Sequence, residues 1–183
     1  MNKPGRPTEL HATELHATDL HATERRATEL ISTLGLQPHP EGGHYGEVFR
    51  SAAPVHSNDG RPARVALTTI DFLLQPGEFS AWHRVASDEV WHLLEGPALR
   101  LWLAPPDVSA FSVVDLGTVA GARRPRHVVP AGWWQAAEPL AAFAYVGATV
   151  GPGFEFADFT FGRDHPLLRA ALQAQRPELM RLL

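Results

Sequence analysis

The sequence contains no cysteine, which excludes thiolate nucleophiles, cysteine-ligated zinc and disulfides from its chemistry. It also lacks an apolar run of about 18 residues, the length that a membrane-spanning helix needs, and its first residues lead into no apolar segment. We therefore expect a cytoplasmic protein that does not interact with a membrane.

Basic charge is scarce as well. The chain of 183 residues has 16 Lys and Arg against 20 Asp and Glu, a formal net charge of -4. The arginines occur in small groups without regularly interleaved aromatic residues, so we do not expect nucleic acid as a partner. The length is sufficient for one domain that buries a core without metal or disulfide crosslinks.

A short repeat distinguishes the beginning of the chain. From Thr8 onward the sequence reads TELHA, TELHA, TDLHA and TERRA. In a helix, a period of five turns each successive leucine by roughly 140°, so the leucines share no face. We interpret residues 1–23 as a flexible or fraying helical leader and residues 24–183 as a single domain. That domain should begin with a docked helix of about ten residues that ends at Gly35.

Short β segments separated by Gly and Pro follow. They lie at residues 44–51, 64–74, 81–85, 88–95, 97–104, 111–117, 126–130, 133–137, 141–150 and 154–162. This spacing, without helical periods between the segments, predicts an all-β antiparallel sandwich or barrel. The last residues predict a helix with Asp164 as its cap, an apolar face and a break at Pro177.

The stretch FSAWHRVASDEVWHLLEG, residues 79–96, combines two histidines with a glutamate on two neighbouring strands. Because side chains alternate along a strand, Glu89 and Trp91 should share one face, whereas His92 should point to the other. His83 is then the histidine that Glu89 can reach.

This stretch resembles the first motif of cupin barrels, in which two histidines precede a glutamate and a glycine follows after six residues. His83, Glu89 and Gly96 occupy three of these positions, and Val85 stands at the second histidine. A second cupin motif has its counterpart in the segment PAGWWQ, residues 130–135, where Gln135 stands at the third histidine.

Four segments together resemble cupin family 5: HPEGGHYGEVFRS, the stretch above, VVPAGWWQAA and VGATVGPGFEFADFTFG. The resemblance covers roughly residues 28–183. It implies a double-stranded β-helix, or jelly-roll, barrel with a short N-terminal helix and C-terminal helices, usually a homodimer, with a pocket at one mouth of the barrel.

The resemblance also implies a metal position, but only two of its four usual ligands are present. His83 and Glu89 are retained and Gln135 is a poor substitute for imidazole. We expect no cofactor, with a divalent Fe, Mn, Ni or Zn ion on His83, Glu89 and Gln135 as the alternative.

Without a metal, acid–base chemistry is the alternative that these residues allow. His83 is the candidate general base, because imidazole titrates near neutral pH, and Glu89 orients it or serves as a second acid. By analogy with cupin sugar epimerases, Tyr45 or Tyr145 is a candidate acid. Glu89 has a structural alternative, an ion pair with Arg84 or Arg100.

Further candidates line the pocket and bind a small polar metabolite. Gln135, Ser87 and Arg84 are candidates to bind ligand oxygens. Trp82, Trp91, Trp134, Phe72 and Phe156 are candidates for an apolar wall, and Glu47, Arg50 and Asp158 for further polar lining. The EGG of residues 41–43 is interpreted as a turn that requires positive φ angles.

Three hypotheses follow. The first is a metal-independent isomerase-, epimerase- or lyase-type enzyme with His83 as base. The second is a non-catalytic cupin that binds or senses a metabolite in the same pocket. The third is a metal-dependent cupin oxygenase or isomerase.

Overall fold

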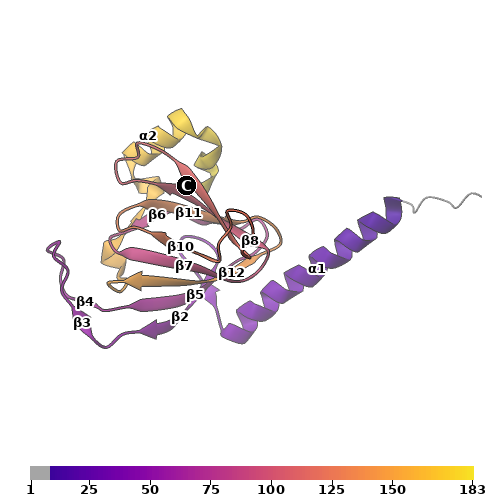
Figure 1. Ribbon diagram of the computed structural model, residues 1–183, viewed down its shortest axis with the longest axis horizontal. Coiled ribbons are helices and arrows are strands. Elements are labelled where there is room, and N and C mark those ends of the chain that lie inside the picture. The colour runs from indigo at the N-terminus through magenta and orange to yellow at the C-terminus, as the bar shows by residue number, and fades with distance from the viewer. Residues whose placement is uncertain (1–8) are drawn as a thin grey trace, which may run out of the picture.

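The computed structural model is built on two antiparallel sheets that face each other (Figure 1). It describes residues 9–183, with side chains from residue 22 onward. The first sheet has the strand order β1-β2-β5-β12-β7-β10, and the second has the order β13-β6-β11-β8-β9. Strands that are neighbours in a sheet are often distant in sequence, so the chain crosses repeatedly between the layers. The predicted all-β cupin jelly-roll barrel is thus confirmed.

The first sheet consists of β1 (Gln37–Pro38), β2 (His44–Arg50), β5 (Thr68–Leu74), β7 (Asp88–Glu95), β10 (Arg126–Val129) and β12 (Ala144–Gly151). The second sheet consists of β6 (Ser80–Val85), β8 (Ala98–Ala104), β9 (Ser112–Gly117), β11 (Trp134–Pro139) and β13 (Phe159–Phe161). A separate hairpin joins β3 (Pro54–Val55) to β4 (Arg64–Val65) and projects from the barrel (Figure 1).

The ten predicted β segments all contain strands, with two differences. The segment 64–74 is divided into β4 and β5, because the backbone at Ala66 and Leu67 bonds to Ala53 and Ser51 instead of continuing the ladder. The segment 154–162 contains a turn of 3₁₀ helix, η1 (Phe156–Asp158), before the short strand β13.

The core between the sheets is apolar and comes from both layers. Phe72, Trp91 and Val146 of the first sheet pack with Leu101 and Ala137 of the second. At about 25 cal/mol per Å² of buried apolar area, burial of such side chains is the main stabilising term of the barrel.

Helical segments cover the outer face of the second sheet. α2 (Pro166–Gln175) and η3 (Pro177–Leu182) follow η2 (Gly162–Asp164), and Leu168 and Leu172 of α2 are buried against Trp82 and Trp134. The break predicted at Pro177 is confirmed. The predicted cap is wrong by one residue, because the side chain of His165 accepts the backbone N–H of Leu168.

A long helix, α1 (Glu9–Leu34), precedes the barrel and projects away from it (Figure 1). It is longer than the ten or so residues expected, since it includes the repeat from Glu9 onward. Its last turns dock through Ala27 and Leu30 on Leu73 and Phe143. The prediction of a flexible leader falls partly on residues 1–8, which lie outside the described residues. None of the described helices is long and apolar enough to cross a bilayer.

The turn before β2 has the geometry predicted for the EGG sequence. Gly42 and Gly43 have φ angles of 107° and 69°. The turn is closed by hydrogen bonds between His39 and both glycines, and the Glu41 carbonyl accepts the Ala81 N–H. This turn therefore fixes residues 39–41 against β6.

A substitution at Gly42 tests this turn. Gly42→Ala should cost at least about 2 kcal/mol of unfolding free energy, because the left-handed backbone is strained and the Cβ would collide with the Phe79 carbonyl oxygen. Gly77→Ala is the matched control: its φ angle is 82° but a Cβ would meet no atom within 4 Å, so only about 1 kcal/mol is expected. Urea unfolding measures both, and equal costs would contradict the role of the turn.

Candidate functional site

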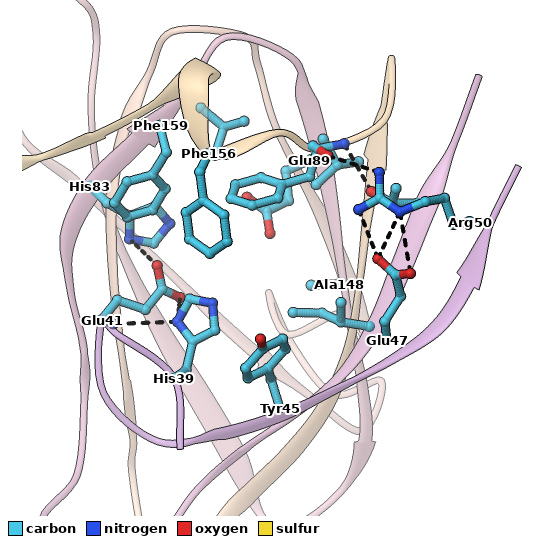
Figure 2. Close-up of a pocket in the computed structure, with 15 residues that line it drawn as sticks. His39, Glu41, Tyr45, Glu47, Arg50, His83, Glu89, Ala148, Phe156 and Phe159 are labelled. Atoms are coloured by element: carbon cyan, nitrogen blue, oxygen red, sulfur yellow. Dashed lines mark hydrogen bonds and ion pairs between the residues drawn. The ribbon is translucent and has the colours of Figure 1, made fainter. Parts of the chain in front are cut away.

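A cavity of about 350 Å³ opens at one mouth of the barrel (Figure 2). Its polar lining residues are His39, Glu41, Tyr45, Glu47, Arg50, Thr68, His83 and Glu89. Its apolar lining residues are Ile70, Val85, Ala148, Val150, Phe154, Phe156 and Phe159. The linked side chains of His83, Glu41 and His39 occupy one side of the cavity, and Arg50 with Glu47 occupies the opposite side (Figure 2).

His83 is held through both of its ring nitrogens. Nδ1 lies 2.7 Å from the Ala81 carbonyl oxygen and 3.1 Å from Oε2 of Glu41. Nε2 lies 3.0 Å from Nε2 of Gln135. The ring also stacks on Phe159, with centroids 5.2 Å apart. His83 is therefore fixed in position and orientation.

The amide of Gln135 determines the proton position on His83. The indole N–H of Trp91 donates to Oε1 of Gln135 at 2.9 Å, and an indole can only donate, so the amide nitrogen must face the other way. That nitrogen donates to Oε2 of Glu89 at 2.5 Å and to Nε2 of His83. Because Nε2 of His83 accepts, the ring proton lies on Nδ1 and is directed at Ala81 and Glu41.

Three polar atoms of the lining remain without a hydrogen-bond partner among the described residues: Oε1 of Glu89, Nε2 of His39 and the hydroxyl of Tyr45. Nδ1 of His39 accepts the Glu41 backbone N–H at 3.3 Å, so the proton of a neutral His39 lies on Nε2. The Tyr45 hydroxyl points into the cavity (Figure 2). These atoms, in contrast to those of His83, are available to a ligand.

Burial shifts the proton equilibria of the site. It raises the pKa of both Glu41 and Glu89 to about 7, although attraction to a nearby histidine partly opposes the shift. Burial lowers the pKa of His39 and of His83 below the usual histidine value. Near neutral pH the site thus contains two carboxyl groups poised between their charged and neutral forms, and two neutral imidazoles.

The mouth of the cavity is bounded by ion pairs. The guanidinium of Arg50 donates to Glu47 at 2.8 Å and to Glu155 at 3.1 Å. Beside it, Asp158 binds Arg61 at 3.0 Å and Arg64 at 2.9 Å, which ties the β3-β4 hairpin to η1.

The structure brings some predicted residues to the cavity and supports it with others. His83, Glu89, Tyr45 and Glu47 line the cavity, as does Phe156. Gln135 lies behind His83 and Glu89. Trp91 and Phe72 belong to the core between the sheets. Glu89 has no arginine partner among the described residues, since Arg100 pairs with Asp115 and Arg84 stacks on Trp134.

Six more predicted candidates lie outside the cavity, among them Trp134, which packs with Trp82 under the helical layer. Tyr145 is on the outer face of β12, where it packs in the cluster under α1. Trp82 and Arg84 alternate with His83 along β6 and face the helical layer. Ser87 accepts a hydrogen bond from Arg61 at 3.2 Å, and Asp158 binds the same arginine. The expected places of these residues in the pocket are wrong.

Sequence reasoning missed His39 and Glu41 as site residues. They lie in the turn of residues 39–43, where no strand alternation predicts a direction for a side chain. A histidine two residues before a glutamate, ahead of two glycines, was the available signal. The EGG sequence predicts the turn correctly, but it does not predict where the side chains of His39 and Glu41 point.

The residues do not fit a cupin metal ion. Among the described residues no three His, Cys, Asp or Glu side chains are grouped as metal ligands. Val85 occupies the second histidine position. The Trp91 bond directs the N–H₂ of Gln135, not its oxygen, toward His83 and Glu89, so Nε2 of His83 and Oε2 of Glu89 accept hydrogen bonds instead of binding a metal.

Comparison with known proteins agrees with this barrel. The Cupin_5 model, described as cupin superfamily (DUF985), matches residues 28–162, and the chain therefore belongs to this cupin family. Among proteins with curated functions, none matches significantly.

Solved structures of similar proteins share the fold. A hypothetical protein from Leishmania major is 30% identical with a TM-score of 0.76, over 85% of this chain and 97% of that one. A protein from Shewanella oneidensis is also 30% identical with a TM-score of 0.72, over 84% and 94%. Oxalate decarboxylase from Bacillus subtilis, at 15% identity and a TM-score of 0.52, over 80% and 36%, shares the fold alone.

The raised pKa of Glu89 predicts how stability depends on pH. An unfolded glutamate ionises near pH 4.5, whereas folded Glu89 does so at about 7, so its stabilising contribution is complete below about 4.5 and is lost as pH rises to 7. A glutamine at this position does not ionise, so Glu89→Gln does not lose stability in this way as the pH rises. The unfolding free energy of Glu89→Gln relative to wild type should therefore increase between pH 5 and 7, by at most about 1.4 kcal/mol per pH unit.

Urea unfolding at several pH values measures the unfolding free energy of Glu89→Gln and of wild type. Subtracting one from the other cancels the pH-dependent contributions of His39 and His83, which have the opposite sign. Glu29→Gln, an exposed position on α1, is the control and should run parallel to wild type. A Glu89→Gln curve that also runs parallel to wild type would show that the carboxyl ionises as freely in the folded as in the unfolded protein.

Proposed function

We propose that this cupin binds a small polar metabolite in the barrel cavity and performs metal-independent proton transfer on it, of the isomerase, epimerase or lyase type. The observation that carries the proposal is a buried carboxyl group, Glu89, that retains one oxygen without a partner in the described part of the chain. A general base must be within hydrogen-bond reach of the proton that it removes, and it works best with a pKa near the operating pH. Glu89 has an available atom and a pKa of about 7.

In this proposal His83 has a positioning role in place of the base role expected from the sequence. Both ring nitrogens are occupied, one by Gln135 and the other by Ala81 and Glu41. His83 holds Gln135, and Gln135 holds Oε2 of Glu89, so that Oε1 is left for the ligand. His83 would affect turnover through this orientation.

The opposite proton comes from His39 or Tyr45 in this proposal. Two donors have no protein acceptor among the described residues: Nε2–H of neutral His39 and the hydroxyl of Tyr45. Their rings lie edge to face, with centroids 4.6 Å apart. With Glu89 as base, either group can return a proton to the ligand or protonate its leaving group.

Deuterium exchange tests this function on several classes of compound at once. The full-length protein is incubated in D₂O with a panel of small hydroxy, keto and amino compounds, and mass spectrometry detects incorporation at carbon. We expect incorporation into one compound class, slowed about 100-fold or more in Glu89→Gln, because removing a general base has an effect of this size.

His92→Gln is the matched control, since His92 points to the opposite face of β7 and does not line the cavity. Equal rates in wild type and Glu89→Gln would refute the role of Glu89. A ligand that is retained in native mass spectrometry but shows no exchange would instead favour a cupin that binds a metabolite without turnover. This alternative is also favoured by His83, because both of its ring nitrogens already have protein partners.

A further inference from the structure

Four aromatic rings line the cavity. Phe154 meets Phe156 and Phe159 edge to face, with centroids 5.1 Å and 6.1 Å apart, and Tyr45 also lines the space. Phe156 is 60% exposed, although such a ring is usually buried. Aromatic faces carry partial negative charge and attract cations, more strongly where water is excluded.

The cavity also has carboxylates without a cationic partner. Glu89 is 7% exposed and Glu41 is 8% exposed, and no Lys or Arg side chain of the described residues binds either of them. Arg50 is the sole Lys or Arg among the lining residues, and its guanidinium is held by Glu47 and Glu155. A buried carboxylate without a countercharge is unfavourable, so a cation entering the cavity would be bound favourably.

We propose that the ligand carries a substituted ammonium group, which binds between the free oxygen of Glu89 and the rings of Phe154, Phe156 and Phe159. The rest of the ligand accepts hydrogen bonds from Nε2–H of His39 and from the Tyr45 hydroxyl. The proposal rests on the proposed function only in taking this cavity as the ligand site, and it does not require turnover.

The proposal makes the charge of the ligand, not its shape, the determinant of affinity. Choline and 3,3-dimethyl-1-butanol have nearly the same shape, but only choline is charged. Isothermal titration of the full chain should give choline an affinity at least about tenfold above that of the neutral alcohol, as expected for a cation held by desolvated rings and a carboxylate. The anion 3,3-dimethylbutyrate should bind more weakly still.

Two variants locate the binding. Glu89→Gln keeps the hydrogen bond from Gln135 but removes the charge, and it should weaken choline several-fold while it leaves the alcohol nearly unchanged. Phe156→Leu changes an exposed ring with little risk to folding, and it should weaken choline several-fold while it leaves the alcohol nearly unchanged. The controls are Glu29→Gln and Phe49→Leu, an exposed phenylalanine outside the lining, and both should bind choline as wild type does.

Equal affinity for choline and the alcohol, preference for the anion, or no binding of choline at millimolar concentration would overturn the proposal. So would choline binding that neither Glu89→Gln nor Phe156→Leu changes, because the cation would then bind elsewhere. None of these results affects proton transfer by Glu89, which the deuterium experiment tests separately on uncharged as well as charged compounds.

Discussion

The geometry of the cavity depends on one hydrogen bond, from the Trp91 indole to the Gln135 amide oxygen. Trp91 lies in the core between the sheets, 1% exposed, so the bond is shielded from water and its donor cannot turn away. The bond gives the amide a single orientation, and from that orientation follow the tautomer of His83 and the position of the Glu89 carboxyl. An apolar core residue thus determines which polar atoms the cavity presents.

The same bond explains why a cupin barrel here has a site unlike a metal centre. In place of a third imidazole, the barrel has the amide of Gln135, whose N–H₂ group donates hydrogen bonds to His83 and Glu89. Metal affinity is reduced, because Nε2 of His83 and Oε2 of Glu89 already accept hydrogen bonds from this amide. The two buried carboxyl groups are tolerated because burial favours the neutral form and raises the pKa of each to about 7.

Much of the fold and part of the site followed from sequence patterns. Strand alternation correctly placed Glu89 and Trp91 on one face and His92 on the other, and cupin spacing correctly joined His83 to Gln135, which pair across β6 and β11. The same alternation should have excluded Trp82 and Arg84, the immediate neighbours of His83. The sequence itself therefore contains the pattern that places these two side chains outside the cavity.

Other features could not be predicted from pattern. Tyr145 is half-buried although it lies on the outer face of β12, because the end of α1 packs beside it, and strand periodicity does not reveal that contact. His39 and Glu41 lie in a turn, where side-chain directions depend on the φ angles of the following glycines and on contacts with β6. The orientation of an amide depends on its three-dimensional neighbours and has no trace in the sequence.

The link between Asp158 and the two arginines of the β3-β4 hairpin has a consequence for how such a protein can diverge. Asp158 lies between Phe156 and Phe159, so the surface hairpin is mechanically joined to the ring-bearing segment at the cavity mouth. Insertions and deletions accumulate in hairpins of this kind at little cost to the core. The range of ligand sizes admitted could therefore change among relatives through hairpin length alone, while every residue inside the barrel stays the same.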